Sequence, residues 1–189
     1  TGEVTVGTAN YTFTSSNWNI AQVAVIQGVD DSLVDVDTTT TVTVSVVDAS
    51  SDDNFDALAD QTVTVTTTDN DTAGFTKSET TQTVTEAGGT DTFTLVLDAQ
   101  PASDVVLNVV SGDTGEVTVS AAPFTFTNSN WDTPQTVTLT GVDDSIIDGD
   151  IQTTVTITVV DASSDDNFDS VADQTVTVTT TDNDTAGFT

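Results

Sequence analysis

The sequence predicts an all-β chain built from antiparallel β-sandwiches. Three observations predict this fold class: segments that alternate valine and threonine, turn-forming clusters that separate these segments, and a near absence of helical patterns. β-branched residues favour strands, and a period of two places successive side chains on opposite faces of a sheet. Each strand is therefore expected to have one apolar face and one face rich in threonine.

The chain contains an internal repeat. Residues 1–76 align without a gap with residues 114–189, at an offset of 113 residues, and 54 of the 76 aligned pairs are identical. A period of this length is too long for one turn of a solenoid and fits one small domain per repeat. The sequence therefore predicts three parts: residues 1–71 are the C-terminal two-thirds of one repeat, with its fourth to seventh strands, residues 72–184 are a complete repeat, and residues 185–189 begin the next.

Seven or eight strands are expected in the complete repeat. The first is broken within 73–85, and the fourth lies within 116–127 with an interruption at 121–123. The remaining strands are expected at 90–98, 104–110, 135–142, 153–160 and 174–181. This number of short strands in about 100 residues is typical of an immunoglobulin-like sandwich of two antiparallel sheets.

Strand parity predicts which side chains form the core. The expected core residues are Val137, Leu139, Val155, Ile157, Val159, Val176 and Val178, together with Phe93, Phe124, Phe126 and Trp131. The intervening threonines are expected to face solvent. Ordered Thr-x-Thr rows can match an ice lattice, but threonine is also the polar residue that suits strands best, and strand propensity is the preferred explanation.

The charge balance excludes several kinds of partner. There are 31 acidic residues and one cation, Lys77, so the formal net charge is -30. A compact domain with this charge repels itself unless counterions are held close, and nucleic acid and anionic membrane surfaces are unfavourable partners. Disorder is disfavoured, because the alternating apolar segments are those of a half-buried sheet.

The residues that are missing exclude several chemistries. The chain has no cysteine and no histidine, which excludes a thiol nucleophile, a Ser-His-Asp relay and ordinary zinc ligation. No segment approaches the roughly 20 apolar residues of a membrane helix, and no signal peptide is present. Direct membrane insertion is therefore not expected, and any secretion signal is expected in a longer precursor.

The carboxylates are concentrated between the strands. In the complete repeat the candidate metal ligands are Glu86, Asp143, Asp144, Asp148, Asp150, Asp165, Asp166, Asp169, Asp182 and Asp184. In the partial repeat they are Asp30, Asp31, Asp35, Asp37, Asp69 and Asp71. Calcium takes about 6 to 8 oxygen ligands, which no single loop here supplies. Folding must therefore bring several loops together if calcium binds.

The order of the strands predicts which loops meet. In an antiparallel sandwich, the loop at 142–150 and the end of the strand at 174–181 lie at the same pole. Glu86 can join them if the broken first strand crosses there. The loop at 161–169 lies at the opposite pole, facing the connection at 68–75, which carries Asp69 and Asp71. Ions held by these carboxylates are expected to stiffen the junction between repeats.

Catalysis and simple solvation account for the acidic clusters less well than calcium does. Paired carboxylates can serve a glycosidase, but such a site needs a cleft with aromatic or cationic residues, and the chain has three Trp or Tyr residues and no Arg. A solvated acidic face does not account for clusters in the same loops of both repeats. The segment DNDTAG begins like an EF-hand loop, but Ala73 and Thr80 fall where ligands are required. No RTX nonapeptide is present, and no catalytic residue is expected.

Three segments resemble Calx-beta domains, and in particular the Calx-beta-like repeats of large bacterial adhesins: TVTEAGGTDTFTLVL, FTFTNSNWDTPQTVTLTGVDDSIIDGD and VTTTDNDTAG. They span most of the 113-residue unit. The resemblance implies calcium ligands at Glu86, Asp143, Asp144, Asp182 and Asp184, and at Asp30, Asp31, Asp69 and Asp71. Asp148 stands where the family usually has Glu. The family's GSDY segment before the fourth strand has no counterpart here.

The function expected from this resemblance is structural. The chain is expected to be an extender segment of a bacterial cell-surface or secreted adhesin, stabilised by calcium, with neighbouring repeats of the same chain as its partners. The alternative is a self-assembling subunit of an extracellular filament or biofilm matrix. In that alternative, identical chains complete the open partial repeat by strand addition.

Overall fold

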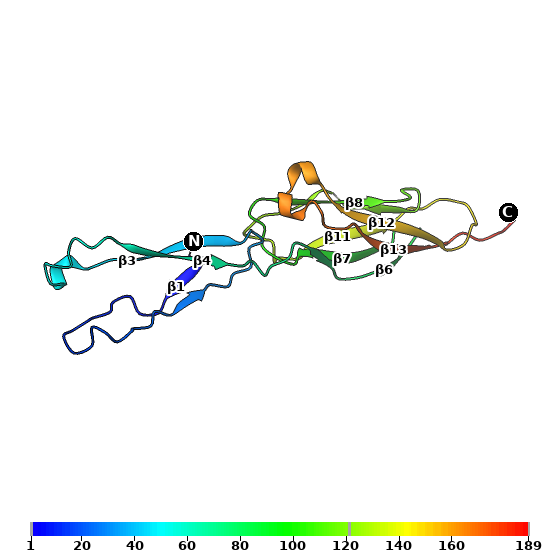
Figure 1. The fold of residues 1–189 in the computed structure, drawn as a ribbon. Helices are drawn as coiled ribbons and strands as arrows, with labels where there is room; N and C mark the ends of the chain where they lie inside the picture. Colours follow the sequence, from blue (N-terminus) through cyan, green and yellow to red (C-terminus); the bar gives the residue numbers. More distant parts are fainter. Residues whose placement is uncertain (1, 121, 189) are drawn as a thin grey trace. The chain divides into compact units, whose positions relative to one another are not determined.

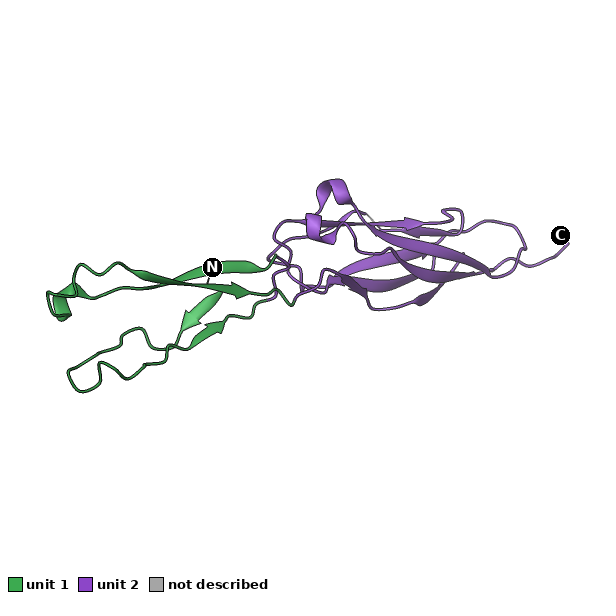
Figure 2. Cartoon of the chain, in the orientation of Figure 1, with its two compact units in different colours: residues 1–31, 36–70 green, residues 32–35, 71–189 purple. Residues whose placement is uncertain are grey.

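The chain forms two compact units in a computed structural model that describes residues 2–120 and 122–188. Unit 1 consists of Thr1–Asp31 and Val36–Asn70, and unit 2 of Ser32–Asp35 and Asp71–Thr189 (Figures 1 and 2). The described residues form strands and three short 3₁₀ helices and contain no α-helix. The predicted all-β fold class is therefore confirmed.

Unit 2 is a sandwich of two sheets. One sheet has the order β10 (Phe124–Phe126), β8 (Val105–Ser111), β12 (Ile151–Val159), β13 (Gln174–Thr181) and β6 (Thr81–Thr85). The other has the order β5 (Phe75–Lys77), β7 (Thr90–Leu97), β11 (Gln135–Gly141) and β9 (Val117–Val119). Neighbouring strands are antiparallel except β6 and β13, which run parallel. The strands expected from sequence are confirmed to within two residues at each end.

The two interrupted patterns correctly predicted breaks in the first and fourth strands, and the structure shows that both strands change sheet at the break. The first expected strand becomes β5 in the four-stranded sheet and β6 in the five-stranded sheet. The fourth becomes β9 and β10 in the same two sheets, and the peptide bond between Ala122 and Pro123 is cis. Each break lets one length of chain cover an edge of both sheets.

The core of unit 2 lies between the two sheets. Strand parity correctly predicted Phe93, Val137, Leu139, Val155, Ile157, Val176 and Val178, which are buried together with Phe124 and Phe126. Val159 and Trp131 are only partly buried and pack against this cluster. The core also includes Phe168 of the 3₁₀ helix η3 (Asp166–Phe168), which the sequence pattern did not single out. A second 3₁₀ helix, η2 (Asp161–Ser163), begins the same loop.

Unit 1 has fewer strands. Strand β1 (Val4–Val6) pairs with β2 (Ile26–Gly28), and β3 (Thr38–Val44) pairs with β4 (Gln61–Thr67), in two separate antiparallel two-stranded sheets. The 3₁₀ helix η1 (Asp48–Ser50) follows β3. At the offset of 113 residues these four strands correspond to β9, β11, β12 and β13. Among the described residues of unit 1, no strand therefore corresponds to β5, β6, β7, β8 or β10.

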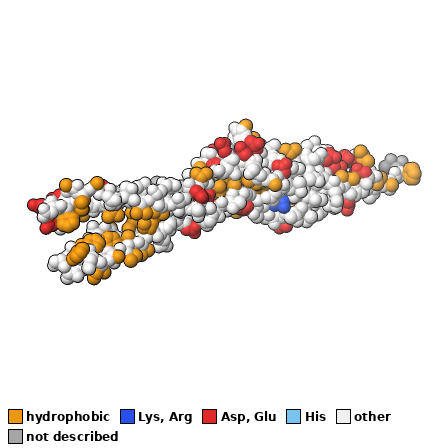
Figure 3. All heavy atoms as spheres, in the orientation of Figure 1, with side chains coloured by type: hydrophobic (Ala, Val, Ile, Leu, Met, Phe, Trp, Pro, Cys, Tyr) orange, Lys and Arg blue, Asp and Glu red, His pale blue; other side chains and the backbone are white. Residues whose placement is uncertain are grey.

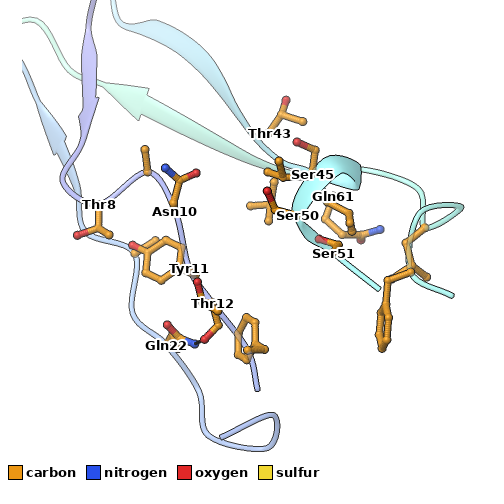
Figure 4. Close-up of a pocket in the computed structure, with 18 of the residues that line it drawn as sticks. Thr8, Asn10, Tyr11, Thr12, Gln22, Thr43, Ser45, Ser50, Ser51 and Gln61 are labelled. Atoms are coloured by element: carbon orange, nitrogen blue, oxygen red, sulfur yellow. Dashed lines mark hydrogen bonds between the residues drawn. The ribbon is translucent and has the colours of Figure 1, made fainter. Parts of the chain in front are cut away.

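Several large apolar side chains of unit 1 are exposed where their counterparts in unit 2 are buried. Phe55 is 55% exposed, whereas its counterpart Phe168 is fully buried, and the same contrast separates Phe13 from Phe126. Phe13 and Phe55 line a cavity of about 1540 Å³, which exceeds the roughly 300–1,000 Å³ of ordinary ligand pockets. Figure 4 shows polar residues such as Tyr11 and Thr43 along its walls. The cavity therefore lies beside apolar side chains that unit 1 leaves uncovered.

Candidate metal centre

Four segments of unit 2 bring carboxylates together at the end of the sandwich near the C-terminus, where Figure 3 shows acidic side chains gathered. They are the turn after β6, the stretch before β9, the loop between β11 and β12, and the residues after β13. Antiparallel topology places the end of β11, the start of β12 and the end of β13 at one pole. The end of β6 joins them because β6 runs parallel to β13.

The first carboxylate group consists of Glu86, Asp182 and Asp184. One carboxylate oxygen from each lies within 4.8 Å of the others. Glu86 directly follows β6, and its N–H donates to the Thr181 carbonyl at 3.2 Å, which extends the pairing of β6 with β13 by one residue. The Glu86 side chain is only 1% exposed. A glutamate is therefore held almost fully buried beside two aspartates.

Hydrogen bonds fix the segment that carries the two aspartates. Asp182 accepts from the N–H of Asp184 at 2.7 Å and from the N–H of Gly149 at 2.9 Å. Its own N–H donates to Asp150 at 3.3 Å. The side-chain amide of Asn183 donates to Asp143 at 3.1 Å. The predicted residues Asp143 and Asp150 thus join the loop between β11 and β12 to the end of β13.

Two glycines make this arrangement possible. Gly149 has φ of +79°, a conformation that side chains disfavour, where it donates to Asp182. A Cβ on Gly141, the last residue of β11, would clash with the Thr85 carbonyl oxygen. The end of β11 therefore approaches the end of β6 closely only because residue 141 lacks a side chain. This approach brings Glu86 to the loop that carries the other acids.

The second carboxylate group consists of Glu116, Asp144 and Asp148, again with one oxygen of each within 4.8 Å of the others. Glu116 directly precedes β9, and its carbonyl accepts from the N–H of Val142 at 2.9 Å. The Glu116 side chain is 9% exposed, and its Oε2 atom is buried without a hydrogen-bond partner. Asp144 accepts from the N–H of Ile146 at 2.6 Å, which shapes the start of the loop.

Glu116 is the residue that sequence reasoning missed. It lies in TGEVTV rather than in an aspartate cluster, and the register that brings it to the loop, Val117 opposite Gly141, is set by folding. The sequence nevertheless contained a feature that could have identified Glu116. Glu3 and Glu116 occupy the same position in the two repeats, and the chain has only four glutamates.

The buried carboxylates perturb one another. Burial raises the pKa of Glu86, and the negative charges of Asp182, Asp144 and Asp148 raise it further. Burial is also the largest cause that raises the pKa of Glu116. The negative charges of Asp148, Asp113, Glu86 and Asp144 raise this pKa further. The charges of Asp144 and Asp148 therefore act on both glutamates. Asp184 also has a raised pKa, from burial and then from the neighbouring carboxylates, whereas hydrogen bonds from Asp184 and Gly149 lower the pKa of Asp182.

The geometry of both groups fits a calcium ion. Two oxygens bound to one ion at about 2.4 Å are at most about 4.8 Å apart, and the oxygens of each group satisfy this limit. The buried oxygens Oε2 of Glu116 and Oδ2 of Asp184 have no hydrogen-bond partner, which is costly for a charged group unless a cation is present. The only basic side chain, that of Lys77, lies on β5. Three carboxylates per group leave the remaining ligand positions to carbonyls and water.

The predicted ligands of the partial repeat are divided between the units. Asp30, Asp31, Asp37 and Asp69 belong to unit 1, whereas Asp35 and Asp71 belong to unit 2. Within unit 1, Asp37 accepts from the N–H of Asp69 at 3.1 Å, which matches the bond between Asp150 and Asp182. At an offset of 113 residues, Glu86 has no counterpart within residues 1–76.

The loop between β12 and β13 lies at the opposite pole of unit 2. Asp165 is 5% exposed; one of its oxygens accepts from the N–H and hydroxyl of Ser103, at 2.8 and 3.2 Å, and the other from the N–H of Asn167 at 3.1 Å. Burial raises its pKa, but these hydrogen bonds outweigh it and the net shift is downward. Asp166 and Asp169 are exposed. Asp165 therefore holds this loop to the start of β8.

No protein-family model matches the chain, and a search of curated proteins finds no similar protein. Among solved structures, the chain is similar to the apo-form Calx CBD1 domain, with 14% identity, a TM-score of 0.45, and coverage of 60% of this chain and 100% of that one. Domains 4 and 5 of the S-layer protein SbsC match with 22% identity, a TM-score of 0.48, and coverage of 77% and 59%. The E. coli chaperone DraB matches with 7% identity, a TM-score of 0.43, and coverage of 60% and 57%.

The matched region spans less than two-thirds of the DraB and SbsC chains. None of the three likenesses reaches a TM-score of 0.5, so the fold class rests on the strands and sheets of the chain itself. Within residues 2–120 and 122–188, no helix has the length and apolarity needed to cross a membrane.

Proposed function

We propose that the chain is a segment of calcium-stabilised structural repeats that act as an extender of a secreted or cell-surface bacterial adhesin. The observation that carries this proposal is the pair of carboxylate groups around Glu86 and Glu116, with a buried and unpartnered oxygen in each. A formal net charge of -30 with a single cation requires that counterions come from solution. Calcium is the abundant extracellular ion that prefers oxygen ligands.

The proposed ligands are the six carboxylates of the two groups, with Asp143 and Asp150 positioning the segments that carry them. The proposal extends to the equivalent carboxylates of the partial repeat once that repeat is complete: Glu3, Asp30, Asp31, Asp35, Asp37, Asp69 and Asp71. Calcium bound at the two groups would neutralise carboxylates from four segments and hold the loop between β11 and β12 against the end of β13. Its contribution is therefore to stability and rigidity, with no reaction step.

The extender role is supported by the repeat itself. Two copies that are identical at 54 of 76 positions support a function that similar units perform together. An array of sandwiches joined by short connections provides length. If the array carries a binding domain, its length keeps that domain at a distance from the surface to which the array is attached.

Titration calorimetry on the chain tests this proposal. We expect calcium to bind with an affinity typical of extracellular modules, about 10⁻⁴ to 10⁻³ M, and to raise the melting temperature of unit 2. Magnesium at the same ionic strength is the control, because it demands a tighter octahedral site than loops of this kind provide. A melting curve that is the same with calcium and with chelator at moderate salt would contradict the proposal.

The exposed apolar face of unit 1 favours a second candidate function. In a self-assembling filament or matrix, strands from another molecule would fill the space that β5 to β8 fill in unit 2. Sedimentation of the chain over a wide concentration range separates the two candidates. A filament subunit would form larger species as concentration rises, whereas an extender segment would stay monomeric when its partial repeat is completed in the same chain.

A further inference from the structure

The two copies of one apolar dipeptide have opposite environments. Leu33–Val34 and Ile146–Ile147 occupy the same place in the repeat, each between Asp-Asp-Ser and Asp. Val34 is 7% exposed and belongs to the core cluster of unit 2, whereas Ile147 is 57% exposed. The two positions have the same sequence context and differ in what surrounds them.

Residues 32–35 are held in unit 2 by an isolated β-bridge and three hydrogen bonds. The N–H of Val34 donates to the Gln100 carbonyl at 2.9 Å, and the N–H of Gln100 donates to the Ser32 carbonyl at 2.7 Å. Leu33 forms a parallel bridge with Gln100. The side-chain amide of Asn167 donates to the Val34 carbonyl at 3.1 Å. A loop that belongs to one repeat in the sequence is thus part of the fold of the next.

A second pair of equivalent residues shows the same contrast. Thr185–Thr189 repeats the sequence of Thr72–Thr76. Phe75, on β5, is 2% exposed in the core of unit 2, whereas its counterpart Phe188 is fully exposed. Two apolar groups of the C-terminal pole, Ile147 and Phe188, therefore have counterparts that are buried in the following repeat.

We propose that Ile146–Ile147 is a docking segment whose partner is a following repeat with the sequence of residues 77–184. In this arrangement the Ile147 side chain enters the core of that repeat as Val34 does in unit 2. Its backbone pairs with the counterpart of Gln100, and its carbonyl accepts from the counterpart of Asn167. The inference rests on the proposed role as a repeat array, but it does not require calcium.

The position of the dipeptide links docking to the metal centre. Ile146 and Ile147 lie between Asp144 and Asp148, both members of the second carboxylate group. An ion bound by these two side chains would fix both ends of the docking segment. The junction between repeats would then be held by a buried side chain and main-chain hydrogen bonds, while the ion orders the loop that supplies them.

Amide hydrogen exchange measured by NMR tests this inference on two chains, the 189-residue chain and the same chain extended after Thr189 by a copy of residues 77–189. The Val34 amide is the internal standard for a docked segment. We expect the Ile147 amide to exchange rapidly in the shorter chain and at least about tenfold more slowly in the extended one. Equal exchange of the Ile147 amide in both chains, with the Val34 amide protected, would overturn the inference.

A variant provides the matched control. Ile147→Asp in the extended chain is expected to abolish the added protection, because a carboxylate cannot enter an apolar core without a partner. Val110→Ser changes a similarly exposed apolar side chain on β8 and is expected to leave the protection unchanged. Ile147 is exposed in the shorter chain, so its replacement should not prevent folding. Calorimetry on the same samples reports calcium binding separately, so failure of docking and failure of the calcium proposal are distinguishable.

Discussion

The main-chain N–H of Asn183 donates a 3.3 Å hydrogen bond to Oε2 of Glu86, and so joins the end of β13 to the turn after β6. The two residues are 97 positions apart in the sequence. The contact lies at the pole of unit 2 that carries the two carboxylate groups. The Glu86 side chain is buried there beside Asp182 and Asp184. The stability of unit 2 should therefore depend on how these charges are neutralised.

Protons should replace calcium in part, so calcium-free protein should gain stability on mild acidification. Glu86, Glu116 and Asp184 have raised pKa values, and a carboxyl with a raised pKa binds its proton more tightly in the folded chain. Stability should rise as pH falls from 7 through these raised values toward the ordinary glutamate value of 4.5. Below that range, the lowered pKa values of Asp182 and Asp165 should reverse the trend.

Melting curves between pH 7 and pH 4, with calcium and with chelator, measure this effect. With saturating calcium the rise should disappear, because the ion already neutralises the same carboxylates and protons then compete with it. If the melting temperature of the calcium-free chain instead falls steadily as the pH is lowered from 7, burial does not raise the pKa values of these carboxyls.

Replacement of Glu116 by glutamine should have opposite effects with and without calcium. The amide keeps the shape of the side chain and removes a buried charge whose Oε2 has no hydrogen-bond partner. Without calcium, Glu116→Gln should raise the melting temperature, and with calcium it should weaken binding at the second carboxylate group. Glu79→Gln makes the same change at an exposed position and is expected to alter neither quantity. Loss of stability in both conditions would assign Glu116 a purely structural role.

The fold could be predicted from the sequence more completely than the site. Alternation of valine and threonine identifies strands and their buried faces because period and burial are local properties, and β11, β12 and β13 were predicted to within two residues at each end. The breaks in the first and fourth strands were also visible from Gly, Pro and polar residues. Phe168 was not, because a single apolar residue in an acidic loop has no periodicity to identify it.

The site depends on contacts that no local pattern contains. Glu116 reaches the loop between β11 and β12 through the register of β9 against β11, and Glu86 reaches it because Gly141 admits the end of β6. Asp165, in turn, was grouped with candidate ligands because it lies in an acidic run. Its hydrogen-bond partner Ser103 lies 62 residues earlier in the chain, so the partnership follows from the tertiary structure.

Neutralisation of Asp143 and Asp144 should weaken calcium binding. Asp144 belongs to the second carboxylate group, and Asp143 accepts a hydrogen bond from Asn183, which stands between Asp182 and Asp184 of the first group in the sequence. In the double variant Asp143→Asn and Asp144→Asn, calorimetry should show fewer or weaker sites in unit 2. Asp132→Asn removes a charge from an exposed position away from this pole and serves as the control. Unchanged stoichiometry and affinity in the double variant would mean that these two residues take no part in calcium binding.

Replacement of Asp165 should reduce stability without affecting calcium binding. Its carboxylate accepts hydrogen bonds from Ser103 and Asn167, and loss of a buried acceptor of this kind costs roughly 1–3 kcal/mol. Denaturant unfolding of Asp165→Ala should show a loss of this order at pH 7, where the lowered pKa keeps the native carboxylate ionised. Asp166→Ala, at an exposed neighbouring position, should have a smaller effect. A decrease in the number of calcium ions bound to Asp165→Ala would instead make Asp165 a ligand.

Addition of the missing strands should complete unit 1. The variant carries a copy of residues 72–113 before Thr1, which reproduces the natural connection between Asp113 and Thr114. Its strands should cover Phe13 and Phe55, and each large apolar side chain that becomes buried contributes roughly 1.5–3 kcal/mol. The dye ANS should bind the 189-residue chain at the open face of unit 1 and should bind the completed chain much less.

The completed chain also supplies the counterpart of Glu86 that residues 1–76 lack. Calcium stoichiometry should therefore increase by the number of ions that unit 2 binds, because every carboxylate of the two groups then has an equivalent in the completed repeat. A control chain carries the same addition with Glu86's counterpart replaced by glutamine, and it should lose the added binding while keeping the reduced ANS signal. If ANS binding stays high in both chains, the added strands do not fill the cavity. The extender and filament candidates would then both lack the strand completion on which they depend.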